Sequence, residues 1–265
     1  MDHDGTMAPT MERQHKWFNY YWSHQINKER TMGKEFPYQD FKSFMKMYNE
    51  KINHPLEVQN VYDFLNLDCD MNDFSHPVWP SYKSFALENP SRLYSGMKEA
   101  IEDIWNLGRL TKDFKVNRRL RLGVNTSNSW NIVSSDLSKN DVLKYFDCFV
   151  SKEILLAYDG NGNASSIKKP SKVSLALALG LLDSPGEYVL HVGDTLNDLV
   201  ASQKIIRLNP MHPETLITVG VSWGYEGKKR LKEGVEVPGQ GRVHFNHIIS
   251  KPFELFGIVE KYFKN

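Results

Sequence analysis

Beyond residue 93, apolar positions along the chain switch repeatedly between helical and strand-like spacing. Residues 97–107 carry apolar side chains every three or four positions, which predicts an amphipathic helix that ends at Gly108. Short apolar runs bounded by polar residues or glycine predict strands at 120–124, 188–192 and 216–221, with helices at 175–182 and 198–204. Because alternating strands and helices build parallel sheets covered on both faces, we expect an α/β, Rossmann-like fold with ligands bound beyond the carboxyl ends of the strands.

Residues 10–90 have a different pattern. Aromatic side chains are dense there and lie in helix-compatible stretches, with no sign of a buried strand. We interpret them as the core of a small helical domain rather than as a cofactor-binding or stacking surface. The predicted organisation is therefore a core formed by residues 1–9 and 91–265, with a helical domain, 10–90, inserted into it.

Composition narrows the class of protein. The chain has 265 residues, of which 25% are charged and 40% hydrophobic, as in folded globular proteins. The net charge of +1 provides no global field for nucleic acid or an anionic membrane, and the longest apolar stretch, near 175–182, is too short to span a bilayer. The two cysteines, Cys69 and Cys148, suggest neither a disulfide framework nor a zinc site. We expect a cytoplasmic protein with no nucleic-acid or membrane partner, and leave its oligomeric state open.

Four short polar motifs carry groups suited to phosphate and metal chemistry. Two carboxylates two residues apart precede a glycine, a hydroxyl follows the strand expected at 120–124, a lysine precedes a proline, and two further carboxylates are four residues apart. In chain order these groups are Asp2 and Asp4, Thr126 with Ser127, Lys169, and Asp194 with Asp198. Each motif alone is weak, since acidic pairs, helix caps and Lys-Pro turns are common at protein surfaces.

Together and in this order, the four motifs resemble those of the haloacid dehalogenase superfamily of phosphohydrolases. The spacing of 24 residues from Lys169 to Gly193 is similar to that of its phosphoglycolate-phosphatase-like branch, as are the segments 93–100, 145–151 and 219–225. The resemblance implies a parallel-sheet core with a helical cap of the C1 type, here residues 10–90, inserted after the first motif. It also implies a magnesium-dependent phosphomonoester hydrolase acting on a small phosphorylated metabolite.

The resemblance further implies a role for each motif. Asp2 would attack phosphorus and form an aspartyl-phosphate, while Asp4 would protonate the leaving group and then deprotonate the attacking water. Thr126, the amide of Ser127 and Lys169 would hold the phosphoryl oxygens.

The same resemblance implies a site for Mg²⁺. Its ligands would be the Asp2 carboxylate, the backbone carbonyl of Asp4 and the carboxylate of Asp194, with Asp198 acting behind them or through a water molecule. All are oxygen ligands, which Mg²⁺ prefers.

Several alternatives stay open at this point. A halide leaves without protonation, so the presence of Asp4 favours a phosphatase over a dehalogenase. A catalytically impaired or regulatory relative, and a phosphomutase, are the other candidates. The sequence does not identify the substrate, nor whether Asn125 or Asn128 contacts it.

The position of the first motif yields one more expectation. Family members carry a buried strand immediately before the first aspartate, whereas only Met1 precedes Asp2 here. We therefore expect the first core strand to be missing from this sequence and the strands on either side of it to lack their central partner.

Overall fold

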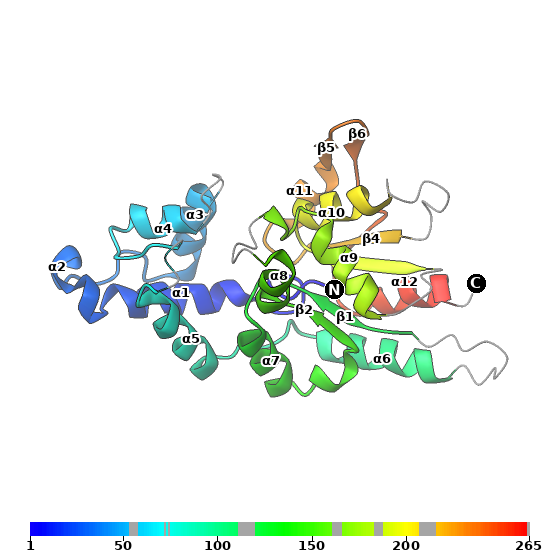
Figure 1. Ribbon diagram of the computed structural model, residues 1–265, viewed down its shortest axis with the longest axis horizontal. Coiled ribbons are helices and arrows are strands. Elements are labelled where there is room, and N and C mark those ends of the chain that lie inside the picture. The colour runs from blue at the N-terminus through cyan, green and yellow to red at the C-terminus, as the bar shows by residue number, and fades with distance from the viewer. Residues whose placement is uncertain are drawn as a thin grey trace. The chain divides into compact units, whose positions relative to one another are not determined.

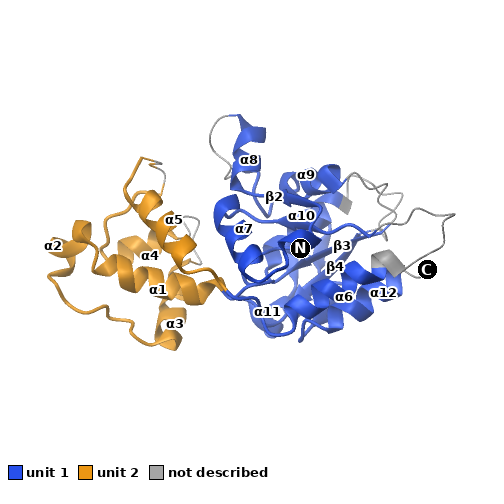
Figure 2. Ribbon diagram, turned by 90° about the horizontal axis from the view of Figure 1, so that it is seen from below, with its two compact units in different colours: residues 1–9, 92–265 blue, residues 10–91 orange. Residues whose placement is uncertain are grey.

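The computed structural model describes residues 1–52, 58–71, 73, 75–110, 120–160, 166–182, 188–206 and 216–263. The chain divides into two compact units, distinguished by colour in Figure 2. Unit 1 comprises Met1–Pro9 and Arg92–Asn265, and unit 2 comprises Thr10–Ser91.

Parallel strands form the centre of unit 1. β1 pairs with β2, with Val124 opposite Phe149, and β4 lies between β3 and β7, with Val192 opposite Val219. The bounds of these strands are Gly123–Asn125 (β1), Cys148–Val150 (β2), Val189–Gly193 (β3), Leu216–Val221 (β4) and His247–Ile249 (β7). All run in the same direction, so their carboxyl ends meet at one edge, as a doubly wound fold requires.

Met1 and Asp2 lie between β1 and β3. The amino group of Met1 donates to the carbonyl of Gly123 at 2.7 Å, and the carbonyl of Met1 accepts from the amide of Asn125 at 2.8 Å. On the other side, the amide of Asp2 donates to the carbonyl of Val192 at 2.9 Å. These two residues thus hydrogen-bond to both flanking strands, at the place where the family's first strand is expected.

Helices cover both faces of this sheet (Figure 1). α6, α7 and α12 contribute side chains such as Ile101, Leu137 and Leu255 to one buried cluster, which also holds Val124 and Val219 of the strands. α9 and α10 lie on the opposite face. The helices of unit 1 are α6 (Met97–Leu110), α7 (Trp130–Lys139), α8 (Lys152–Asp159), α9 (Val173–Leu182), α10 (Leu196–Ile206), α11 (Gly227–Glu233) and α12 (Glu254–Phe263), with a 3-10 turn at Leu143–Tyr145. An antiparallel hairpin of β5 (Val235–Val237) and β6 (Gly241–Val243) completes the unit.

All regular secondary structure in the described residues of unit 2 is helical, and the unit has an aromatic core. Trp17 stacks on Tyr21 with ring centroids 4.7 Å apart and donates from Nε1 to the hydroxyl of Tyr62 at 2.7 Å. Phe18 packs on the same Tyr62, with centroids 4.8 Å apart. The helices are α1 (Thr10–Trp22), α2 (Lys28–Thr31), α3 (Phe41–Ile52), α4 (Gln59–Phe64) and α5 (Val78–Glu88), with a 3-10 turn at Gln25–Asn27.

The structure corrects the sequence-based boundaries of several elements, including α9 and α10, which each begin two residues earlier than predicted. The helix predicted to end at Gly108 continues to Leu110, because a glycine inside a helix costs only about 1 kcal/mol. The strand expected at 120–124 is Gly123–Asn125 instead, and β2 was not predicted, since three residues are too few to show a period. The strand expected at 216–221 is β4 with the same bounds, and that at 188–192 is β3, displaced by one residue.

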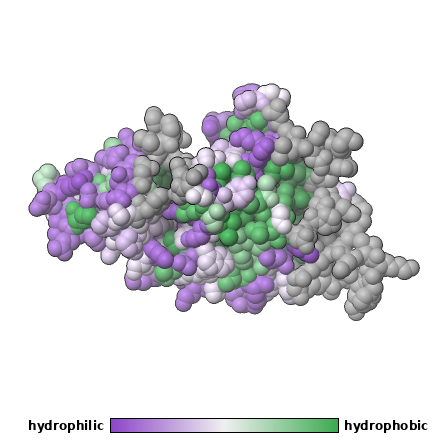
Figure 3. Space-filling model, viewed as in Figure 1, coloured by the Kyte–Doolittle hydropathy of each residue, from purple (hydrophilic) through white to green (hydrophobic). Residues whose placement is uncertain are grey.

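Within the described ranges, no helix is both long enough and apolar enough to cross a bilayer. Figure 3 shows hydrophobic residues gathered on the face of unit 1 where Figure 1 draws α8 and α9. Exposed large side chains on these helices include Ile154, Tyr158 and Leu181.

Candidate active site

A buried ion-paired cluster lies at the carboxyl edge of the sheet in unit 1. The Nζ atom of Lys169 is 2.8 Å from Oδ1 of Asp2 and 2.8 Å from Oδ1 of Asp198, and it also donates to the carbonyl of Asn125 at 3.2 Å. The side chains are almost inaccessible, with 10% of Lys169, 11% of Asp2 and 1% of Asp198 exposed. Lys169 thus connects the first and last motifs to the end of β1.

The start of α10 explains the position of Asp198. Thr195 immediately precedes the helix, and its amide and hydroxyl donate to Oδ2 of Asp198 at 3.2 Å and 2.7 Å. This is the pattern of a capping box, in which the side chain at the third helical position accepts from the N-cap residue. Asp198 therefore caps its own helix with one oxygen and binds Lys169 with the other.

Asp194 follows β3 directly and is completely buried. Its Oδ1 accepts from the hydroxyl of Thr6 at 2.9 Å, and its Oδ2 accepts from the amide of Tyr225 at 2.8 Å. Gly5 and Gly224 make this close approach possible: a Cβ at either position would collide with the Asp194 side chain, and Gly5 also has a φ of +77°. The glycine of the first motif is thus required by packing as well as by the turn.

Three of these carboxylates are arranged as a metal site. One oxygen from each of Asp2, Asp194 and Asp198 lies within 4.8 Å of the other two, and all three residues are buried. Burial and the nearby charges of Asp2 and Asp198 raise the pKa of Asp194 well above its ordinary value, which means that its ionised form lacks compensating positive charge. A hard divalent cation would supply that charge and prefers oxygen ligands, so these residues fit Mg²⁺.

Lys169 influences the pKa values of the two carboxyl groups that it contacts. Burial raises the pKa of Asp2 to about 6, even though Lys169 opposes the shift. For Asp198, burial acts in the same direction, but the adjacent Lys169 and His191 prevail and lower its pKa. The pKa of Lys169 itself is raised, because Asp198 and Asp2 outweigh the cost of burial. Lys169 is therefore a permanent cation beside Asp2.

Asp4 lies among hydrogen-bond donors of the loop that follows β1. The hydroxyl of Thr126 donates to Oδ2 of Asp4 at 3.3 Å, and Nδ2 of Asn128 is 3.3 Å and 3.4 Å from its two carboxylate oxygens. The amide of Asn128 in turn donates to the hydroxyl of Thr126 at 3.1 Å. Thr126 is buried, whereas Ser127, beside it, is exposed.

The structure thus brings Asp2, Lys169, Asp194 and Asp198 into one cluster, and Asp4 with Thr126 into the adjoining loop. Sequence reasoning did not single out four further groups that contact these residues: Thr6, His3, Asp136 and the amide of Tyr225. Thr6 ends the first motif and Tyr225 lies in a segment that carried the family resemblance, so both had a local signal. His3 and Asp136 are far apart in sequence and had none.

Comparisons with known proteins identify the family and the fold. Residues 1–206 match the haloacid dehalogenase-like hydrolase family, whereas no curated protein matches the chain in sequence. Among solved structures, a predicted phosphoglycolate phosphatase from Haemophilus somnus 129pt is 17% identical with a TM-score of 0.61, covering 97% of this chain and 95% of that one. A haloacid dehalogenase-like family hydrolase from Streptococcus pneumoniae is 16% identical with a TM-score of 0.57, with the same two coverages of 97% and 95%.

A third structure contains a ligand. It is a mutant of CbbY from Rhodobacter sphaeroides in complex with xylulose-(1,5)bisphosphate; it is 19% identical with a TM-score of 0.55, and the match covers 96% of this chain and 93% of that one. At these identities the solved structures show the fold alone, while the family match spans most of the chain and includes all four motifs. The chain belongs to the haloacid dehalogenase-like hydrolase family.

Proposed function

We propose that this protein is a magnesium-dependent phosphomonoester hydrolase that works through an aspartyl-phosphate. The observation that carries the proposal is the buried cluster in which Lys169 lies 2.8 Å from Asp2 while oxygens of Asp194 and Asp198 lie within 4.8 Å of an Asp2 oxygen. Phosphoryl transfer needs an oxygen nucleophile surrounded by positive charge, and this cluster offers both.

The residues of the chain divide the reaction into two displacements. In the first, a carboxylate oxygen of Asp2 forms a bond to phosphorus, the bond from phosphorus to the ester oxygen breaks, and Asp4 donates a proton to that oxygen. In the second, Asp4 takes a proton from water, the water oxygen attacks phosphorus, and the bond from Asp2 to phosphorus breaks. Free phosphate leaves, and both aspartates return to their starting states.

Positive charge and donors around the phosphoryl group complete the site. Lys169, the hydroxyl of Thr126 and the amide of Ser127 would hold its oxygens. Mg²⁺ would be held by the carboxylates of Asp2 and Asp194 and the backbone carbonyl of Asp4, with Asp198 keeping Lys169 in place behind them. When bound, the ion supplies charge neutralisation at the phosphoryl oxygens.

We infer that the substrate is a small phosphorylated metabolite and that unit 2 acts as the cap that selects it. The xylulose-(1,5)bisphosphate bound to the similar CbbY mutant supports a sugar phosphate as one member of a test panel. Two-carbon and three-carbon phosphorylated acids are others, since a predicted phosphoglycolate phosphatase has a similar fold.

The direct test is phosphate release from nitrophenyl phosphate and from the panel, with Mg²⁺ and with chelator. Asp2→Asn should lower kcat by at least about 1000-fold, because the amide is a poor nucleophile. Asp141→Asn is the matched control, since Asp141 is an exposed carboxylate that pairs with Lys144 on the surface, and it should retain wild-type activity. Asp2→Asn turning over at the wild-type rate would exclude the nucleophile.

A covalent readout addresses the intermediate itself. With nitrophenyl phosphate, whose leaving group departs without a proton, Asp4→Asn should still form the intermediate but lacks the base that activates water, so the phosphoryl group should accumulate on the peptide that contains Asp2. Mass spectrometry of rapidly quenched samples would show one added phosphoryl group that hydroxylamine removes. An unmodified peptide in an Asp4→Asn protein that still releases alcohol from its ester would argue for direct attack by water.

A further inference from the structure

His3 lies between two carboxylates in the interior of unit 1. Its Nδ1 atom is 3.5 Å from Oδ1 of Asp4, and its Nε2 atom is 3.5 Å from Oδ2 of Asp136. Both His3 and Asp136 have 0% of their surface exposed, whereas 27% of the Asp4 side chain remains accessible. The three side chains thus form a line from a buried helix residue to the rim of the candidate active site.

Stability alone does not account for an imidazole at this position. Among the described residues, neither ring nitrogen of His3 makes a hydrogen bond of ordinary length. A buried polar group without a close partner costs about 1–3 kcal/mol, whereas an apolar side chain would fill the same space without that cost. Each ring nitrogen faces a carboxylate oxygen, so the surroundings of His3 are polar on both sides of the ring.

The backbone around His3 links it to the reacting groups. Its amide donates to Oδ1 of Asp2 at 2.8 Å, and Asp4 is the next residue. Asp136 belongs to α7, the helix that begins just after the loop from which Thr126 and Asn128 reach Asp4. One helix and its preceding loop therefore reach Asp4 by two routes, directly through the loop and indirectly through His3.

We propose that His3, located between Asp136 and Asp4, is a positioning residue that orients the Asp4 carboxyl group toward the oxygen of the leaving group. The inference rests on the proposed function, in which Asp4 is the general acid. His3 does not touch the substrate in this scheme. It restricts the rotation of the partly exposed Asp4 side chain from the buried side, together with Thr126 and Asn128 on the side of the loop.

Leaving-group dependence separates this role from a purely structural one. An alkyl phosphate needs a proton on its departing oxygen, whereas nitrophenolate leaves readily without one. His3→Leu should therefore lower kcat/KM, which reports only the steps up to release of the alcohol, about 10- to 100-fold for an alkyl ester and less than about 3-fold for nitrophenyl phosphate. Asp136→Asn, which is isosteric, should also lower kcat/KM more for the alkyl ester than for nitrophenyl phosphate. The loss should be smaller than in His3→Leu, because His3 remains in place.

The matched control is His247→Leu. His247 lies on β7, where its Nε2 atom is 3.0 Å from the hydroxyl of Tyr262, and we give it no part in the reaction. This variant should leave the ratio of kcat/KM for the alkyl ester to kcat/KM for the aryl ester at the wild-type value. Binding of orthovanadate, a phosphate mimic, should be unchanged within about 3-fold in the His3 and Asp136 variants, because the phosphate-binding groups are intact.

The outcomes distinguish this inference from the proposed function. Equal losses of kcat/KM for both esters, or no loss for the alkyl ester, would overturn the positioning role while leaving the phosphatase in place. A wild-type protein that hydrolyses no ester would overturn the function and this inference with it. Should His3→Leu fail to fold, Asp136→Asn carries the test, since replacing one oxygen by nitrogen conserves the packing of α7.

Discussion

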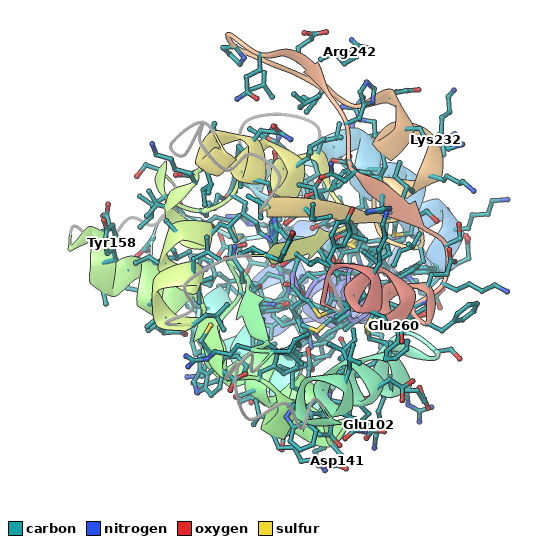
Figure 4. The ribbon with its side chains drawn as sticks, turned by 90° about the vertical axis from the view of Figure 1, so that its right-hand side faces the viewer. Glu102, Asp141, Tyr158, Lys232, Arg242 and Glu260 are labelled. Atoms are coloured by element: carbon teal, nitrogen blue, oxygen red, sulfur yellow. The ribbon has the colours of Figure 1, made fainter. Side chains whose placement is uncertain are left out.

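The two units bury different kinds of side chains. At the sheet edge of unit 1, three carboxylates and a lysine are nearly inaccessible, although burying charge is costly unless it is paired. The largest fully buried side chains of unit 2 are aromatic, and its ion pair between Arg30 and Asp68 is at the surface. Other charged groups of unit 1, such as Glu102, Asp141, Lys232 and Arg242 in Figure 4, lie on its outside. Unit 2 also buries one charged side chain, Arg13, but among the described residues all buried carboxylates belong to unit 1, and three of them, Asp2, Asp194 and Asp198, lie where the proposed chemistry requires them.

Removing the buried cation is the most severe way to test this contrast. Lys169→Met leaves Asp2 and Asp198 facing each other without the charge that links them, and breaking such a pair costs about 3–5 kcal/mol. We expect that loss in urea unfolding without metal, together with a fall of about 1000-fold in kcat/KM. Lys144→Met, which breaks the exposed pair with Asp141, is the control. A free energy of unfolding and a kcat/KM near the wild-type values for Lys169→Met would show that Lys169 does not stabilise the cluster.

The corresponding test in unit 2 removes a neutral group. Trp17→Phe loses the indole N–H that donates to the Tyr62 hydroxyl and part of the stacking on Tyr21, for an expected loss of about 2 kcal/mol. Hydrogen exchange should increase in peptides of α1 and α4 and remain unchanged in β3 and β4. Mg²⁺ affinity measured by calorimetry should not change. A weaker affinity would show that the aromatic core of unit 2 and the charged cluster of unit 1 are not independent.

A buried histidine in unit 1 provides a smaller, pH-dependent effect. Burial lowers the pKa of His191 from 6.5 to about 3, so as the pH falls from about 7 the unfolded state takes up a proton that the folded state does not. The stability contributed by the neutral ring is complete above pH 6.5 and is progressively lost toward pH 3. Between pH 7 and pH 5.5 the loss should be about 1 kcal/mol relative to His191→Gln, from unfolding curves in metal-free buffer.

Ser202→Ala is the control for that measurement. The Ser202 hydroxyl lies 2.7 Å from Nδ1 of His191, so this variant removes a contact and keeps the titrating ring. It should lower stability at every pH and retain the wild-type pH slope. Identical slopes in wild type and His191→Gln would show that His191 does not contribute to the pH dependence.

How far the sequence predicted the site depends on where each residue's partners lie. Asp2, Lys169, Asp194 and Asp198 belong to compact motifs whose order along the chain resembles that of a known family, and this resemblance predicted that they meet in one site. The ring of His3 and the carboxylate of Asp136 meet across 133 positions, and a single sequence carries no signal for that contact. Residue type gave no help either, because a histidine between two aspartates reads as part of an acidic, solvated turn.

The fold shows the same limit. β4, with six buried residues in succession, was predicted with its bounds, whereas β2 has three residues and becomes a strand only because β1 pairs with it. The two residues Met1 and Asp2 are too short to show any pattern, yet they hydrogen-bond to β1 and β3. Tertiary pairing decides such short elements, and local periodicity cannot reveal it.

The exposed ion pair of unit 2 gives the smallest expected effect and completes the contrast. Arg30 and Asp68 approach to 2.6 Å, closer than Lys169 and Asp198, but 45% and 29% of their side chains are exposed. Solvent screens such pairs, so Arg30→Gln should cost less than about 1 kcal/mol and leave kcat unchanged. High salt should remove what remains of the difference between Arg30→Gln and wild type, but not the loss in Lys169→Met, because only the exposed pair is accessible to ions. A loss for Arg30→Gln as large as that for Lys169→Met would mean that distance, rather than burial, governs these pairs.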